Sequence, residues 1–132
     1  ISAAGSAAIL AGGGAGASAA AFSATGVLID FDHLADYWRE TGVNADVPRF
    51  MAYFANREPS HLLLFLHAWE WCLLSAALLA WMNFGAAWPW WAAAGWLTHL
   101  ALDHKFNRLH PMAYFLSFRA RHGFKAERFY KD

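Results

Sequence analysis

Histidines and carboxylates gather at three places along an otherwise apolar chain. In chain order they are Asp30, Asp32, His33 and Asp36, then His67 and Glu70, then His99 and Asp103. Imidazole and carboxylate ligands together suit zinc, manganese or iron, and the lack of a cysteine cluster disfavours a structural zinc site. The sequence therefore predicts a divalent metal site. Its expected ligands are Asp30, Asp32, His33, His67, His99 and Asp103.

The spacing within these groups places a carboxylate beside an imidazole. His67 and Glu70 are three residues apart, and His99 and Asp103 are four apart, so each pair shares one face of a helix. A bound metal ion lowers the pKa of a coordinated water to about 7. We expect Glu70 or Asp36 to act as the general base toward such a water.

Long uncharged runs predict the elements that position these groups. The chain of 132 residues has 58% hydrophobic residues, 15% charged residues and a net charge of zero, which excludes a basic nucleic-acid-binding domain. No Asp, Glu, Lys or Arg occurs in residues 1–29 or 71–102, and about 20 apolar residues suffice to span a bilayer as a helix. The prediction is an all-α integral membrane protein with one domain over residues 1–132. Transmembrane helices are expected at about 3–29, 61–84 and 88–106, and short interfacial helices at about 46–56 and 111–122.

The basic residues predict an orientation in the membrane. All ten Lys and Arg lie in residues 38–60 or after residue 103, and basic residues favour the cytoplasmic side. This places the N-terminus outside the cell and the C-terminus in the cytoplasm. The first and third helices then end where the second begins, so the three polar groups meet at the cytoplasmic face. Membrane lipids and other membrane subunits are the expected partners, and nucleic acid is not.

Three segments together resemble a known protein family. They are Asp-Phe-Asp-His at residues 30–33, the histidines at 61 and 67, and Gly-x-x-x-His-x-x-x-Asp at residues 95–103. In this order they resemble the small membrane-bound metal-dependent hydrolases of the bacterial inner membrane. The resemblance implies hydrolysis of a phosphoester or lipid-like substrate. It also implies metal binding by Asp30, Asp32, His67, His99 and Asp103. The second segment departs from the family pattern, because the Arg, Gly, Thr and Ser that usually accompany the two histidines are absent.

Two other interpretations fit the same residues. The chain could be an accessory or structural subunit of a larger respiratory or photosynthetic membrane complex, in which His67 or His99 is an axial ligand to haem or a chlorophyll-type pigment. Carboxylates beside both histidines favour a hard metal ion over a macrocycle. The polar groups could also form an interhelical network of hydrogen bonds without any metal.

Overall fold

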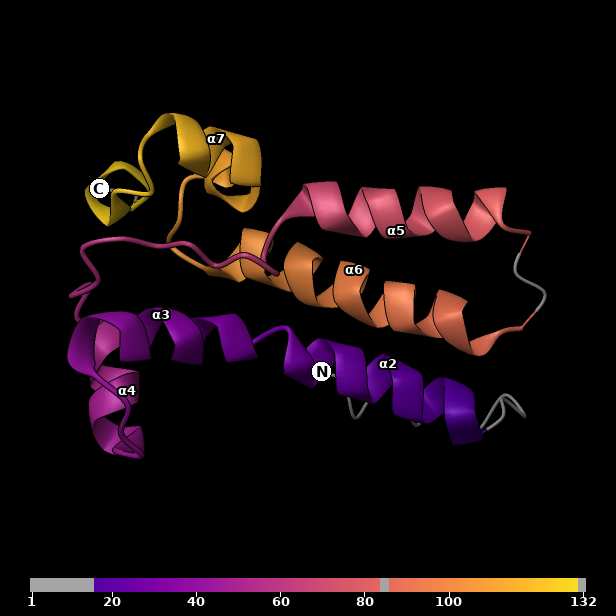
Figure 1. Ribbon diagram of the computed structural model, residues 1–132, viewed down its shortest axis with the longest axis horizontal. Helices are drawn as coiled ribbons and strands as arrows, with labels where there is room; N and C mark the ends of the chain where they lie inside the picture. Colours follow the sequence, from indigo (N-terminus) through magenta and orange to yellow (C-terminus); the bar gives the residue numbers. More distant parts are fainter. Residues whose placement is uncertain (1–15, 84–85, 131–132) are drawn as a thin grey trace.

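Helices α2 (Gly16–Leu28), α6 (Trp88–Phe106) and α5 (Trp69–Trp81) lie side by side along the long axis of the structure (Figure 1). The computed structural model describes residues 16–83 and 86–130. Within these ranges the chain forms helices, turns and loops but no β-strand. Helix α6 packs against both α2 and α5, so it is the central element of the three.

The remaining elements gather at one end of these helices (Figure 1). Helix α3 (Phe31–Thr41) follows α2 after a short break, and α4 (Val47–Ala55) packs against α3. The C-terminal part contains the 3-10 helix η1 (Pro111–Tyr114), α7 (Leu116–Arg121) and the 3-10 helix η2 (Ala126–Arg128). The predicted helix at 111–122 is therefore divided at Phe115, which has an extended backbone.

The prediction of three membrane-spanning helices is wrong for the part of the chain that the structure describes. None of its helices has both the length and the apolar composition that crossing a bilayer requires. The predicted multi-pass inner-membrane protein, with an outside N-terminus and a cytoplasmic C-terminus, is wrong on the same finding. Residues 3–15 of the first expected span lie outside the described residues.

Each expected span differs from a membrane helix for an identifiable reason. Helix α2 has 13 residues in the described range, and α5 also has 13 because residues 61–68 are not helical. Thirteen residues rise only about 20 Å, less than the roughly 30 Å of a hydrocarbon core. Helix α6 has 19 residues, but its last two turns carry histidines, an aspartate and a lysine, which lower its hydropathy.

A glycine lets α2 and α6 approach closely. A Cβ atom built on Gly95 would collide with the backbone of Phe22, including its carbonyl carbon at 3.1 Å and its Cα at 3.2 Å. Only a residue without a side chain therefore fits at this crossing. One helical turn further along each helix, the carbonyl oxygen of Gly26 faces the His99 ring, with 2.9 Å to Nδ1. The close contact at Gly95 thus sets the distance between Gly26 and His99.

The non-helical segment 60–67 is held against α3 by three acidic side chains. Asp32, Asp36 and Glu40 are spaced four residues apart on α3, and each accepts hydrogen bonds from two consecutive backbone N–H groups of the segment. The pairs are Leu66 and His67 on Asp32, Leu63 and Leu64 on Asp36, and Ser60 and His61 on Glu40. We call this set the α3 carboxylate ladder. It supplies the partners that these backbone groups would otherwise find in a helix.

Candidate metal centre

Four ligand atoms from three parts of the chain converge at the junction of α2 and α3. The Nε2 atoms of His67 and His99 lie 3.1 Å apart. Asp30 Oδ1 is 3.5 Å from the first and 3.3 Å from the second. Asp103 Oδ2 is 3.4 Å and 3.6 Å from the same two nitrogens. The group of Asp30, His67 and His99 could hold a metal ion, as could the partly overlapping group discussed below.

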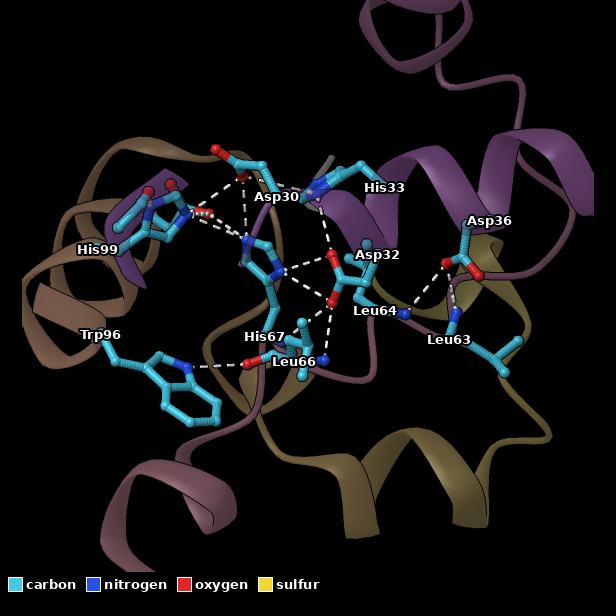
Figure 2. A network of polar contacts seen from close by, with 12 residues as sticks. Asp30, Asp32, His33, Asp36, Leu63, Leu64, Leu66, His67, Trp96 and His99 are labelled. Carbon is cyan, nitrogen blue, oxygen red and sulfur yellow. Dashed lines mark hydrogen bonds and ion pairs between the residues drawn. The ribbon is translucent and has the colours of Figure 1, made fainter. Parts of the chain in front are cut away.

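In both histidines, the hydrogen bond of Nδ1 fixes the direction in which Nε2 points. His67 Nδ1 lies 2.9 Å from Asp32 Oδ1 (Figure 2), and His99 Nδ1 lies 2.9 Å from the Gly26 carbonyl oxygen. Both of these oxygens only accept hydrogen bonds, so each Nδ1 carries the proton. In the neutral rings, Nε2 of His67 and of His99 then presents a lone pair to the other ring and to the carboxylates. A carboxylate or carbonyl on the remote nitrogen is the usual arrangement behind a metal-binding histidine.

The electrostatics of the cluster favour a positive charge at its centre. Burial disfavours protonation of His67, but the contacts with Asp103, Asp30 and Asp32 outweigh it and raise the pKa of His67 to about 10. Burial also disfavours protonation of His99, but its contacts with Asp103 and Asp30 outweigh burial and raise the pKa of His99 to about 9. Burial acts to raise the pKa of Asp103, but its contacts with both imidazoles lower the value to about 2. The cluster could therefore take up either protons or a metal ion.

Asp32 and His33 lie next to this cluster. With His67 they form a second group whose atoms are close enough to hold an ion. However, Asp32 already accepts hydrogen bonds from the Leu66 and His67 backbone and from His67 Nδ1. His67 Nδ1 carries a proton and cannot bind a metal at the same time. The first group is thus the better centre, with Asp32 as the residue that orients His67.

The His33 ring lies beside two carboxylates. Its Nδ1 is buried and has no hydrogen-bond partner among the described residues, although Asp32 Oδ1 is 3.3 Å away and Asp30 Oδ1 is 3.8 Å away. Its ring packs edge-on against the His67 ring, with 4.5 Å between centroids. His33 therefore belongs to the wall of the site rather than to its ligand set.

Neither predicted general base lies at the cluster. Asp36 belongs to the α3 carboxylate ladder and faces the backbone of Leu63 and Leu64 (Figure 2). Glu70 accepts hydrogen bonds from the backbone N–H groups of Leu116 and Ser117, at 3.0 Å and 2.9 Å, and from the Ser117 hydroxyl. These contacts cap the start of α7, so Glu70 joins α5 to α7 instead of taking part in chemistry.

Two residues that sequence reasoning missed hold His67 in place. The Arg119 side chain is 1% exposed and donates to the carbonyl oxygens of Leu64 and His67. Trp96 Nε1 donates to the carbonyl oxygen of Leu66 at 3.0 Å (Figure 2). The sequence pattern indicates only a basic helix end at Arg119 and an apolar residue at Trp96. Nothing in it signals that either side chain binds a remote backbone.

Replacing Gly95 with alanine is expected to lower metal affinity about 10-fold to 100-fold, the range for residues that orient ligands. The new methyl group would push α6 away from Phe22 and lengthen the bond between His99 and Gly26 one turn further on. Titration with zinc against a chromophoric chelator would measure the change. Gly16→Ala is the matched control, because a Cβ there meets nothing within 4 Å. Equal affinities of the two variants would contradict this role of Gly95.

The geometry does not suit a macrocyclic cofactor. The Nε2 atoms of His67 and His99 face each other across 3.1 Å, and His67 is 1% exposed. Neither ring therefore offers its nitrogen to the open face that axial ligation of haem or a chlorophyll-type pigment requires. The arrangement suits a small ion shared between the two rings.

Comparisons with known proteins found no similarity to this chain. No family model matches it, and no curated protein or solved structure matches it either. The resemblance to membrane-bound metal-dependent hydrolases therefore stays a prediction. The functional argument rests on the geometry of the residues alone.

Proposed function

We propose that the chain binds one divalent transition-metal ion through His67, His99, Asp30 and Asp103. The observation that carries this proposal is that Asp30 Oδ1 and Asp103 Oδ2 each lie within 3.6 Å of the Nε2 atoms of both His67 and His99. Two Nε2 lone pairs 3.1 Å apart would repel each other unless a proton or a metal ion lies between them. The contacts of Asp32 and of the Gly26 carbonyl with the two Nδ1 atoms support this proposal.

Zinc fits the distances and the ligand types best. Ligand atoms about 2.0–2.1 Å from a tetrahedral zinc are about 3.3–3.4 Å from one another. The distances from the two Nε2 atoms to Asp30 Oδ1 and Asp103 Oδ2 range from 3.3 to 3.6 Å. Manganese and iron accept the same ligand types, so the metal test includes them.

We also propose that the centre hydrolyses its substrate. Asp30 has a side chain 56% exposed, so the ligand cluster is open to solvent on one side. A bound divalent ion supplies a water of lowered pKa, about 7, as the nucleophile. Within the described part of the site, His33 is an imidazole that is not a ligand in this proposal, and its ring packs against the His67 ring with 4.5 Å between centroids. We assign His33 to accept the proton from that water.

The test of metal binding is stoichiometry and affinity in the purified full chain. After removal of adventitious metal, addition of zinc, manganese or iron(II) is expected to load one ion per chain. Asp32→Asn is expected to weaken binding about 10-fold to 100-fold, because His67 loses the carboxylate that orients it. Asp46→Asn is the control, since Asp46 only caps α4. Absence of a stoichiometric ion with all three metals would refute the proposal.

Metal binding is expected to strengthen as pH rises. The folded-state pKa values of His67 and His99, about 10 and about 9, lie above the ordinary value of about 6.5. In the metal-free protein, the stability gained from these protons is complete below about pH 6.5 and is lost as pH rises through 9 and 10. The ion competes with these protons, so its affinity is expected to rise with pH below about pH 9.

Thermal unfolding with and without zinc measures this effect. The increase in Tm that saturating metal produces is expected to be small near pH 6 and large near pH 8.5, because bound metal stabilises by mass action. An increase of the same size at both values would show that the ion does not displace protons from these histidines.

A further inference from the structure

A cavity of about 340 Å³ opens beside His33, away from the four proposed ligands. Its walls come from the end of α4, from the segment 60–67, from the turn after α6 and from the C-terminal part. The polar side chains that line it are His33, Arg57, Asn107, Arg108 and Tyr130. A volume near the lower end of the range for small-molecule sites is enough for a compact ligand.

The charged residues among the described lining of this cavity are both basic. Arg57 and Arg108 line it, and no carboxylate of the described residues does. Within residues 16–83 and 86–130, neither arginine forms an ion pair. By contrast, Arg49 binds Glu58 at 2.6 Å, and Arg39 lies 3.3 Å from Glu40. In the described part of the chain, neither of the two arginines of the cavity is therefore paired with an acid.

Arg57 is held in position in an unusual backbone conformation. Its φ is 58°, in the left-handed region that glycine adopts more easily than any other residue. Its guanidinium lies over the Tyr130 ring, 5.2 Å from the centroid, which restricts the side chain to the cavity wall. A guanidinium group held in this way, with a second arginine in the same lining, suits the planar, bidentate recognition of an oxyanion.

The cavity and the ligand cluster share a wall. The His33 ring lines the cavity and contacts the His67 ring on the other side. Asn107 also lines the cavity and follows Asp103 by one turn, with its backbone N–H donating to the Asp103 carbonyl oxygen at 2.9 Å. A molecule bound in the cavity would therefore lie next to His33 and Asn107, which contact the proposed metal ligands His67 and Asp103.

We propose that this cavity binds the phosphate group of the substrate, so that the substrate is an organic phosphate. This inference rests on the proposed function, because it names the part of the substrate, a phosphate group, that binds beside the proposed metal centre. Phosphate is favoured because two guanidinium groups match its charge and its several acceptor oxygens. The apolar residues of the same cavity, such as Phe54 and Leu109, would contact the organic part.

The probe is inorganic phosphate, and the protein is the full chain loaded with zinc or with manganese. Binding is followed by calorimetry with the zinc form. With the manganese form, ³¹P relaxation reports whether the bound phosphate lies close to the paramagnetic ion. The variants are Arg57→Gln, Arg108→Gln and the double variant. The control is Arg121→Gln, which removes one exposed arginine outside the cavity.

Wild-type protein and the control are expected to bind phosphate with equal affinity and to show enhanced ³¹P relaxation. Each single variant is expected to bind about tenfold more weakly, the size of one lost charge-assisted contact, and the double variant to lose the relaxation effect. All variants are expected to load one metal ion. If the double variant binds phosphate as tightly as the wild type, the cavity is not the site and the inference is overturned.

The two proposals fail in different ways. A chain that loads metal but binds no phosphate overturns this inference and leaves the metal centre standing. A chain that binds phosphate through Arg57 and Arg108 but loads no metal refutes the metal centre and supports the cavity as an anion site. Arginine-dependent binding without enhanced relaxation in the manganese form would overturn the proximity of the phosphate to the ion.

Discussion

Replacing Arg119 with methionine is expected to lower the free energy of unfolding by about 3 kcal/mol or more. The Arg119 guanidinium is buried and donates to the carbonyl oxygens of Leu64, His67 and Ala113 at 2.8, 3.1 and 2.9 Å. Methionine would fill much of the volume but leave the buried carbonyl groups of His67 and Ala113 without this donor, at about 1–3 kcal/mol each. The Leu64 carbonyl would keep only the hydrogen bond from the His67 N–H. Urea-induced unfolding, followed by circular dichroism, measures the difference.

Two comparisons make this prediction specific. Arg119→Lys is expected to recover little of the loss, because one ammonium group cannot reproduce the planar fork that reaches three carbonyl groups. Arg121→Met changes an exposed arginine two residues further along and is expected to change stability by less than about 0.5 kcal/mol. Equal stabilities of the Arg119 and Arg121 variants would show that the buried contacts contribute little.

Replacing His67 or His99 with alanine is expected to weaken metal binding at least about 100-fold. Structural zinc sites in peptides have binding free energies of about 10–16 kcal/mol. Shared among four ligands, this is about 3 kcal/mol for each, or about 100-fold in affinity. Competition with a chelator of known affinity measures the loss. The His67→Ala variant is also expected to be less stable without metal, because His67 is 1% exposed and its removal leaves a cavity.

The control for these variants is His122→Ala. His122 is exposed, and its ring bonds to the Phe118 carbonyl oxygen at 2.8 Å, so its loss should leave the metal affinity unchanged. If the His99 variant binds zinc as tightly as the His122 variant does, the ion is bound elsewhere and the proposed ligand set is wrong.

Local spacing predicted part of the candidate site. The i, i+4 relation of His99 and Asp103 places both on one face of α6, and both Asp103 Oδ2 and Asp30 Oδ1 contact His99 Nε2. Asp30, His67 and His99 are far apart in the sequence, and their convergence was predicted from helices that reverse direction. In the structure, α2, α5 and α6 do lie side by side (Figure 1). The prediction reversed the helices at the two sides of a membrane, whereas in the structure the packing of α2 and α5 on α6 places them side by side.

The membrane prediction failed because it used the absence of charge as its main signal. The absence of charge sets neither the length of a helix nor its surroundings: α5 has only 13 residues, and of these only Cys72 is buried. Residues 61–68 are apolar enough to extend α5, yet Asp32, Asp36 and Arg119 bind their backbone in a non-helical form. Such tertiary contacts override local propensity, and for the same reason Glu70 could not be assigned to the start of α7.

The α3 carboxylate ladder has a consequence for the order of folding. Its hydrogen bonds join residues 20 to 35 positions apart in the sequence. Segment 60–67 therefore cannot take its shape until α3 is a helix with its three acids aligned, and until the loop that contains α4 has closed. We expect His67 to reach its position late, after Asp30 and His99 are placed by the packing of α2 on α6. A nascent chain would then gain the ability to hold its ion only in the last steps of folding.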